Sequence, residues 1–182
     1  MKTCSSLAIF AVSFLLSSIT AHARSVKMTK RIDNCPEIVG VVNLHRQFHH
    51  DKEHYVYTTN SSEVDRSAVG YEYDGVLGGA FEKQEASTVP LYHIYNDHTQ
   101  ANFYTTDEAE RESELSHNLA NVDRGIAAFV LSKRACGSKP LFRQFNPATG
   151  NHFLTTDEEE VEYALTDRGY EEPIISGFVM QK

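Results

Sequence analysis

The sequence predicts an α+β fold that is mostly β: a compact pseudo-threefold domain of three hairpin–helix–strand repeats. Three observations lead to this prediction. A Leu-led segment occurs three times, a threonine pair begins 14 residues after each leading leucine, and a helix-start signal follows each pair. The first, second and third repeats span residues 41–88, 89–138 and 139–182. Units of this size are each too small to bury their own apolar face, so they must share a core.

Each repeat opens with a segment in which apolar and polar residues alternate, as is typical of a β-strand. The leading leucines are Leu44, Leu91 and Leu141, which we expect to be buried together. A polar turn and a second strand-like segment follow, and the threonine pairs 58–59, 105–106 and 155–156 end that segment. A strand, a tight polar loop and another strand predict a β-hairpin in each repeat.

A helix-start signal follows each threonine pair, because an Asn or Asp precedes a Glu by three residues as in a capping box. The predicted caps are Asn60, Asp107 and Asp157. After each cap we expect a short helix with one buried stripe, formed by Val161 and Leu165 in the third repeat and by Leu115 and Leu119 in the second. Gly-containing apolar segments then predict one or two closing strands.

Closed packing of three repeats hides sheet edges better than an open stack does. We therefore predict either a β-trefoil-like arrangement or a short propeller-like closure, preceded by an N-terminal segment at residues 24–40. The capped helices argue against a regular trefoil.

Residues 1–23 have the features of a secretory signal peptide. Lys2 supplies a positive start, and residues 7–16 form an apolar run that is too short to span a bilayer as a helix. Ala21 and Ala23 form the small-x-small pattern before a cleavage position at Arg24. A core helix at the start of the fold is the alternative, but it does not explain why these three parts occur in order. We expect a secreted, extracellular protein.

The chain is acidic, with a formal net charge of −8 at pH 7. Lys2 is the one charged residue of the predicted leader, so its removal changes the net charge to −9. Such a surface repels nucleic acid and anionic lipid. We expect glycans or extracellular proteins as partners, with no nucleic acid and no membrane insertion.

Cys35 and Cys136 are the two cysteines that remain once Cys4 leaves with the leader. In an oxidising compartment they most simply form one disulfide, and two free thiols or an intermolecular bridge are the alternatives. Asn60 begins an Asn-Ser-Ser sequon, so secretion predicts a glycoprotein with a glycan at this residue.

The second and third repeats carry a recognisable pattern. Residues 89–96 read VPLYHIYN and residues 139–146 read KPLFRQFN, and the following strands read NFYTT and HFLTT. These residues resemble a family of uncharacterised secreted repeats with P-L-Y-R-x-Y-N and H-F-Y-T-T units. The resemblance implies an accessory binding domain and supplies no catalytic residues. The first repeat departs from the pattern at residues 43–45, which read NLH, and in its histidine-rich turn.

One polar position recurs in all three repeats. It is occupied by Arg46, His93 and Arg143. Tyr57 and Tyr104 accompany it, and aromatic faces beside fixed polar groups are typical of sugar-binding sites. We predict that these five residues bind a ligand. The alternative is that the tyrosines lie in the core and the arginines brace neighbouring repeats.

The first hairpin is rich in histidine, at His45, His49, His50 and His54. Histidines on a turn can bind zinc or copper, but their spacing does not recur in the other repeats, so we expect no metal and no cofactor. No serine lies in a nucleophile-elbow motif, and an active site is usually one asymmetric constellation. We therefore predict a non-enzymatic, lectin-like carbohydrate-binding domain. A secreted protein-binding effector and an extracellular hydrolase are the alternatives.

We predict that the secreted chain contains a Cys35–Cys136 disulfide. Intact mass after alkylation should show no modified cysteine before reduction and two modified cysteines after it. Two alkylated thiols on the unreduced protein would contradict the pairing.

Overall fold

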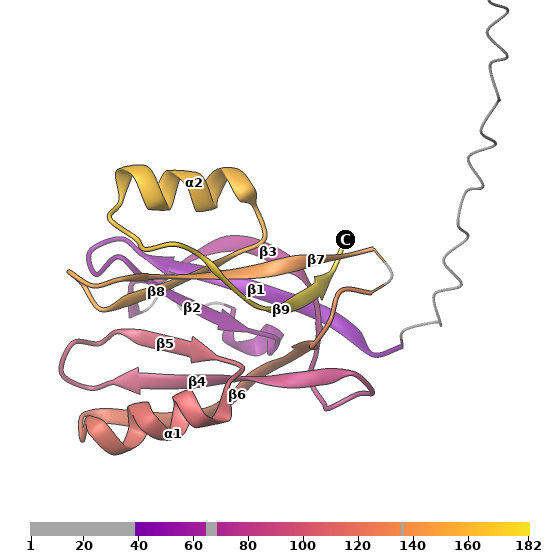
Figure 1. The fold of residues 1–182 in the computed structure, drawn as a ribbon, viewed down its shortest axis with the longest axis horizontal. Helices are drawn as coiled ribbons and strands as arrows, with labels where there is room; N and C mark the ends of the chain where they lie inside the picture. Colours follow the sequence, from indigo (N-terminus) through magenta and orange to yellow (C-terminus); the bar gives the residue numbers. More distant parts are fainter. Residues whose placement is uncertain (1–38, 65–68, 136) are drawn as a thin grey trace, which may run out of the picture. The chain divides into compact units, whose positions relative to one another are not determined.

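The computed structural model describes residues 39–64, 69–135 and 137–182 (Figure 1). The predicted leader, most of the segment at 24–40, and both Cys35 and Cys136 lie outside the described residues. Secretion and the disulfide therefore stay predictions.

Within the described residues, nine strands form one antiparallel sheet, with helical segments between some of them. The strands are β1 (Val41–His49), β2 (His54–Thr58), β3 (Glu72–Phe81), β4 (Thr88–Asn96), β5 (Asn102–Thr105), β6 (Asn121–Leu131), β7 (Ser138–Asn146), β8 (Asn151–Thr155) and β9 (Ile174–Met180). The helical segments are the 3-10 turn η1 (Ser61–Glu63), α1 (Glu108–His117) and α2 (Glu158–Asp167). The prediction of an α+β, mostly β fold is confirmed.

In each repeat, one strand pairs with two others. β1 pairs with β2 and β3, β4 pairs with β5 and β6, and β7 pairs with β8 and β9. The last strands of the repeats also pair with one another at single positions. These pairs are Phe81 with Phe129, Leu131 with Phe178, and Gly79 with Met180. All nine strands are thereby joined.

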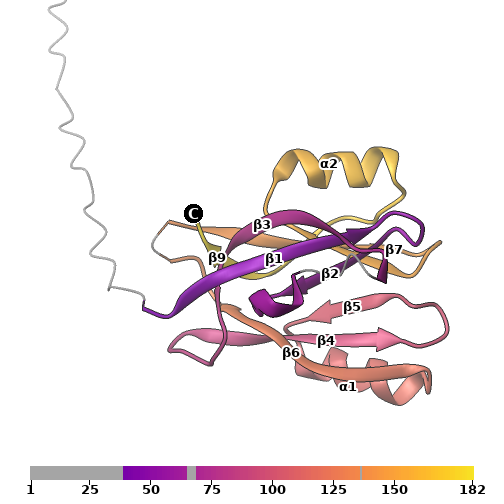
Figure 2. The same cartoon turned by 180° about the vertical axis from the view of Figure 1, so that it is seen from behind.

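The helices lie on the strands of their own repeats. α1 contacts β4, β5 and β6, whereas α2 contacts β7 and β8. Figure 2 shows α1 beside β4 and β6. The predicted caps are confirmed, since Asn60, Asp107 and Asp157 are the N-caps of η1, α1 and α2 and each side chain accepts a backbone N–H. In the described part of the chain, no helix has the length and apolar character needed to cross a membrane.

The buried helical stripe that we expected in the second repeat is wrong. α1 contains no buried residue and ends at His117, so Leu119 lies beyond it and is 98% exposed. α2 buries Ala164, whereas Val161 and Leu165 are only partly buried. Helix α1 reads EAERESELSH and has little apolar surface to bury, so the sheet supplies the core instead.

The core lies where the repeats meet. Leu44, Leu91 and Leu141 are fully buried in one cluster, as predicted. Close approach of the last strands requires glycine at Gly78 and Gly177, because a Cβ at either position would lie 2.6 Å from a valine methyl group of a neighbouring strand.

The second threonine of each pair bonds to a different repeat. The hydroxyls of Thr59, Thr106 and Thr156 donate to the carbonyl oxygens of Ala127, Ser176 and Leu77 at 3.2, 2.7 and 2.9 Å. These bonds run from the first repeat to the second, from the second to the third, and from the third to the first. The threonine pairs that recur in the sequence therefore connect the repeats.

Replacing Thr106 with valine should lower the free energy of unfolding by about 1–3 kcal/mol, because the partly buried Ser176 carbonyl loses its donor. Thr106→Ser keeps the hydroxyl and is the matched control, for which we expect a smaller loss. Urea unfolding measures both. No loss in Thr106→Val, or a larger loss in Thr106→Ser, would contradict a stabilising role for this hydrogen bond.

Candidate functional site

Arg46, on β1, is buried and bound to carboxylates. Its Nη1 and Nη2 donate to Oε2 and Oε1 of Glu160 at 2.7 and 2.8 Å, and its Nε lies 2.7 Å from Oδ2 of Asp74. The guanidinium carbon also lies 5.8 Å from the Tyr55 ring centroid and 5.6 Å from that of Phe153. A bidentate pair of this kind is strong and geometrically specific. Arg46 therefore joins the first repeat to the third.

Arg143, on β7, joins the third repeat to the second in the same way. Its Nη1 and Nη2 donate to Oε2 and Oε1 of Glu110 at 2.8 and 2.7 Å. Nη1 also donates to the Tyr104 carbonyl at 2.8 Å, and the guanidinium lies 5.3 Å from the Phe103 centroid. Both arginines are 8% exposed, so their placement fits the bracing role that we considered as the alternative to ligand binding.

The arginines keep their glutamate partners ionised. Hydrogen bonds from Arg46 lower the pKa of Glu160 and outweigh the opposing effect of burial. For Glu110, burial opposes ionisation, but hydrogen bonds from Arg143 and Thr105 outweigh it and the pKa is again lowered.

His93, on β4, occupies the recurring position in the second repeat and is arranged differently. Its ring stacks on Tyr104 with centroids 4.5 Å apart, and its Nε2 lies 2.8 Å from Oδ1 of Asn102.

Glu63 occupies the position in the first repeat that Glu110 and Glu160 occupy in the other two. Its carboxylate accepts hydrogen bonds from Thr58 and Asn60, and among the described residues it has no arginine partner.

A cavity of about 710 Å³ opens between the first and second repeats at this place. We call it the His93 pocket, and its polar and aromatic lining includes Glu63, His93, Tyr95, Gln100, Asn102 and Arg124. Asn102 is 4% exposed, and its Nδ2 has no hydrogen-bond partner among the described residues. The Arg124 guanidinium lies 5.0 Å from the Tyr95 ring centroid. The pocket therefore combines a buried donor, a carboxylate and an aromatic ring.

Two of the predicted ligand-binding residues, Tyr57 and Tyr104, lie in the core. They are 1% and 0% exposed, and their rings meet edge to face at 5.0 Å. The Tyr57 hydroxyl donates to the Leu154 carbonyl at 3.1 Å and accepts from the Leu154 N–H at 2.7 Å. Neither ring face is open to a ligand, because the surrounding repeats cover both. Their placement fits the core role that we considered as the alternative to ligand binding.

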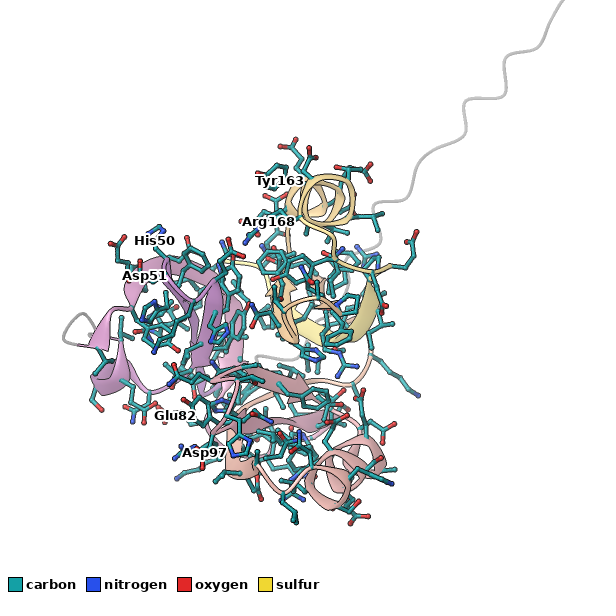
Figure 3. All side chains as sticks on the ribbon, turned by 90° about the vertical axis from the view of Figure 1, so that its left-hand side faces the viewer. His50, Asp51, Glu82, Asp97, Tyr163 and Arg168 are labelled. Carbon is teal, nitrogen blue, oxygen red and sulfur yellow. The ribbon has the colours of Figure 1, made fainter. Side chains whose placement is uncertain are left out.

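The histidines of the first hairpin differ in how far they are buried. His49 and His54 are buried cross-strand neighbours, whereas His50 is exposed at the outer end of the hairpin, 3.0 Å from Glu72 (Figure 3). His45 lies 3.3 Å from the Tyr73 hydroxyl. Across the described ranges, no group of three or more potential metal ligands comes together.

Sequence reasoning missed Glu63, Tyr95, Gln100, Asn102 and Arg124. A signal was available in the departures of the second repeat from the pattern of the others. His93 replaces an arginine, Asn102 replaces Tyr55 or His152, and Arg124 takes the place that Asp74 has beside Arg46. The repeated residues hold the repeats together, and the departures line the pocket.

Acid should weaken the fold partly through the two ion pairs. The pKa values of Glu110 and Glu160 are lowered from 4.5 in the folded protein, so each ion pair stabilises the fold above that pH and is lost as pH falls through the lower folded value. The Glu110→Gln/Glu160→Gln variant should be less stable near neutral pH and should lose less stability on acidification. Urea unfolding at about pH 7 and about pH 3 measures this.

Glu159→Gln is the matched control, because Glu159 is exposed on the same helix as Glu160. It should follow the acid dependence of the unmodified chain. The same acid dependence in the double variant would show that the ion pairs do not contribute.

Comparison with known proteins places the chain in a family but gives no activity. Residues 43–180 match the family described as a domain of unknown function, DUF5648. No curated protein and no solved structure matches the chain. Because the match extends from β1 to β9, the protein belongs to the DUF5648 family.

Proposed function

We propose that the protein is a secreted, non-enzymatic binding domain that holds carbohydrate in the His93 pocket. Secretion is supported by the leader pattern of residues 1–23. The observation that carries the binding proposal is Asn102, which lines a cavity of about 710 Å³ and whose buried Nδ2 has no hydrogen-bond partner among the described residues. An unpaired buried donor is costly, and a bound ligand can satisfy it.

The chemistry of the pocket suits a neutral sugar. Each sugar hydroxyl both donates and accepts, so a binding site needs groups of both kinds. The Glu63 carboxylate accepts, Arg124 and Asn102 Nδ2 donate, and the Gln100 amide does both. Tyr95 is partly exposed and adds an aromatic surface beside them.

We also propose that the three repeats close around a pseudo-threefold centre, in the trefoil-like or propeller-like manner expected from the sequence. The closed series of threonine hydrogen bonds and the mutual pairing of β3, β6 and β9 support this. In Figure 3 the three colour groups of the ribbon lie around a common centre.

Such a closure has three junctions. Arg46–Glu160 closes one and Arg143–Glu110 closes another. The His93 pocket is then the third junction, where a shorter histidine replaces arginine and leaves room for a ligand.

Among the described carboxylates, no resolved shift raises a pKa toward neutral pH, as a carboxylic general acid would need. A general acid or base works best when its pKa lies near the working pH. Among the described carboxylates and histidines, the resolved shifts are downward: Glu110 and Glu160 are lowered by their arginines, and burial lowers the pKa of His152 to about 3. The hydrolase alternative therefore gains no support.

Glycosylation of Asn60 is compatible with the cap that this residue forms. Asn60 is exposed, and its Oδ1 accepts the Ser62 N–H at 3.1 Å. A glycan on Nδ2 leaves this acceptor in place. We propose that secreted material carries a glycan at this residue.

A glycan array probed with the secreted protein should identify a bound sugar. Asn102→Ala and Tyr95→Leu should each weaken that binding by about tenfold, because one removes a desolvated hydrogen bond and the other an aromatic contact. Gln100→Ala is an additional test at an exposed position that places no core packing at risk.

Tyr73→Leu is the matched control, since Tyr73 is an exposed strand tyrosine outside the pocket. It should leave binding unchanged. If no glycan binds at up to about 1 mM protein or sugar, the carbohydrate proposal is wrong and a protein partner is favoured.

A further inference from the structure

We infer a second ligand site, for a small organic cation with an alkylated nitrogen, between the second and third repeats. A cavity of about 470 Å³ lies there, and we call it the Phe145 cavity. It shares no lining residue with the His93 pocket. The inference therefore does not depend on the carbohydrate proposal.

Aromatic rings from three strands line part of the cavity. They belong to Phe103 on β5, Phe145 on β7 and His152 on β8. The Arg143 guanidinium already lies 5.3 Å from the Phe103 centroid, so Phe145 is the ring on which the site chiefly depends. The His152 centroid lies 4.5 Å from that of Phe103 and 4.8 Å from that of Phe145. Burial lowers the pKa of His152 to about 3, so its ring is neutral at ordinary pH and does not repel a cation.

The charges around these rings are predominantly negative. The charged side chains of the lining are Glu110, Glu114, Arg143 and Glu171. Glu110 and Arg143 neutralise each other through two hydrogen bonds, so Glu114 and Glu171 leave the cavity with two net negative charges. Glu114 accepts one bond from Asn121 at 3.3 Å and keeps further acceptor capacity.

Rings and carboxylates together select the class of cation. A metal ion needs several oxygen or nitrogen ligands in its shell, and ring faces do not provide them. An alkylated ammonium places methyl groups against aromatic rings while its charge is attracted by the ring faces and by nearby carboxylates. The volume lies in the range of small-molecule sites.

The wall of the cavity also contains a buried imidazole. His152 is 8% exposed, and its Nδ1 has no hydrogen-bond partner among the described residues. Within the described part of the chain, a neutral imidazole therefore lines the cavity with Nδ1 unbonded.

Choline is the probe, and 3,3-dimethyl-1-butanol, its uncharged carbon isostere, is the matched ligand control. Titration of the full secreted chain, followed by calorimetry and by NMR shifts of amides around Phe145, should show choline binding at about 1 mM or tighter. The isostere should bind at least about tenfold more weakly, because it has the shape but lacks the charge.

Two variants test the two parts of the site. Glu114→Gln/Glu171→Gln should weaken choline binding by about tenfold, and Phe145→Leu should weaken it by about threefold or more. Glu112→Gln, an exposed change on α1 outside the cavity lining, should have no effect. Thermal unfolding of each variant verifies the fold.

Equal binding of choline and its isostere would overturn the inference, because the cavity would then be a merely apolar one. Absence of choline binding at about 50 mM, or binding unaffected by both variants, would also overturn it. Glycan binding should be unchanged in Phe145→Leu, so failure of this site and failure of the His93 pocket are separately observable.

Discussion

The hydrogen bonds of the threonine pairs are the interactions on which the other contacts depend. The first threonine bonds within its own repeat, as when Thr105 accepts the Asp107 N–H at 3.0 Å and donates to Glu110. The second, Thr106, bonds to the Ser176 carbonyl of the next repeat. The end of the second strand of each hairpin is thus hydrogen-bonded both within its own repeat and to a neighbouring repeat. Glu110 is thereby held where Arg143 reaches it, and Glu160 is held in the same way for Arg46.

The repeats differ at their junctions, and some differences compensate each other. The Tyr57 hydroxyl bonds to the backbone of Leu154, and the Tyr104 hydroxyl accepts the Tyr57 N–H at 3.2 Å. In each of these bonds a tyrosine hydroxyl of one repeat contacts the backbone of another repeat. Leu154, at the equivalent position of the third repeat, has no hydroxyl that could do the same. Arg143 instead donates to the Tyr104 carbonyl, so that buried acceptor is satisfied by an ion-paired side chain. This difference leaves the buried Tyr104 carbonyl hydrogen-bonded. By contrast, where histidine replaces arginine at position 93, the residue lines the His93 pocket.

Both cavities lie beside the second repeat, and their charges differ. The His93 pocket includes Lys52 and Arg124 in its lining, whereas the Phe145 cavity has two uncompensated carboxylates. Electrostatic attraction should therefore direct different ligands to them. Two sites of different charge on one small domain accord with the binding function that we propose.

Local pattern was enough to predict the hairpins, the caps at Asn60, Asp107 and Asp157, and the burial of the leading leucines. Period, capping chemistry and turn residues act over a few neighbouring positions, so a single sequence reveals them. Only the packed structure revealed the roles of the recurring tyrosines and arginines, which are Tyr57, Tyr104, Arg46 and Arg143. A recurring aromatic or cationic residue has the same sequence spacing whether it lies in a core or in a binding site. The cavities also escaped prediction, because each is formed by side chains from two repeats that meet only after the chain has folded.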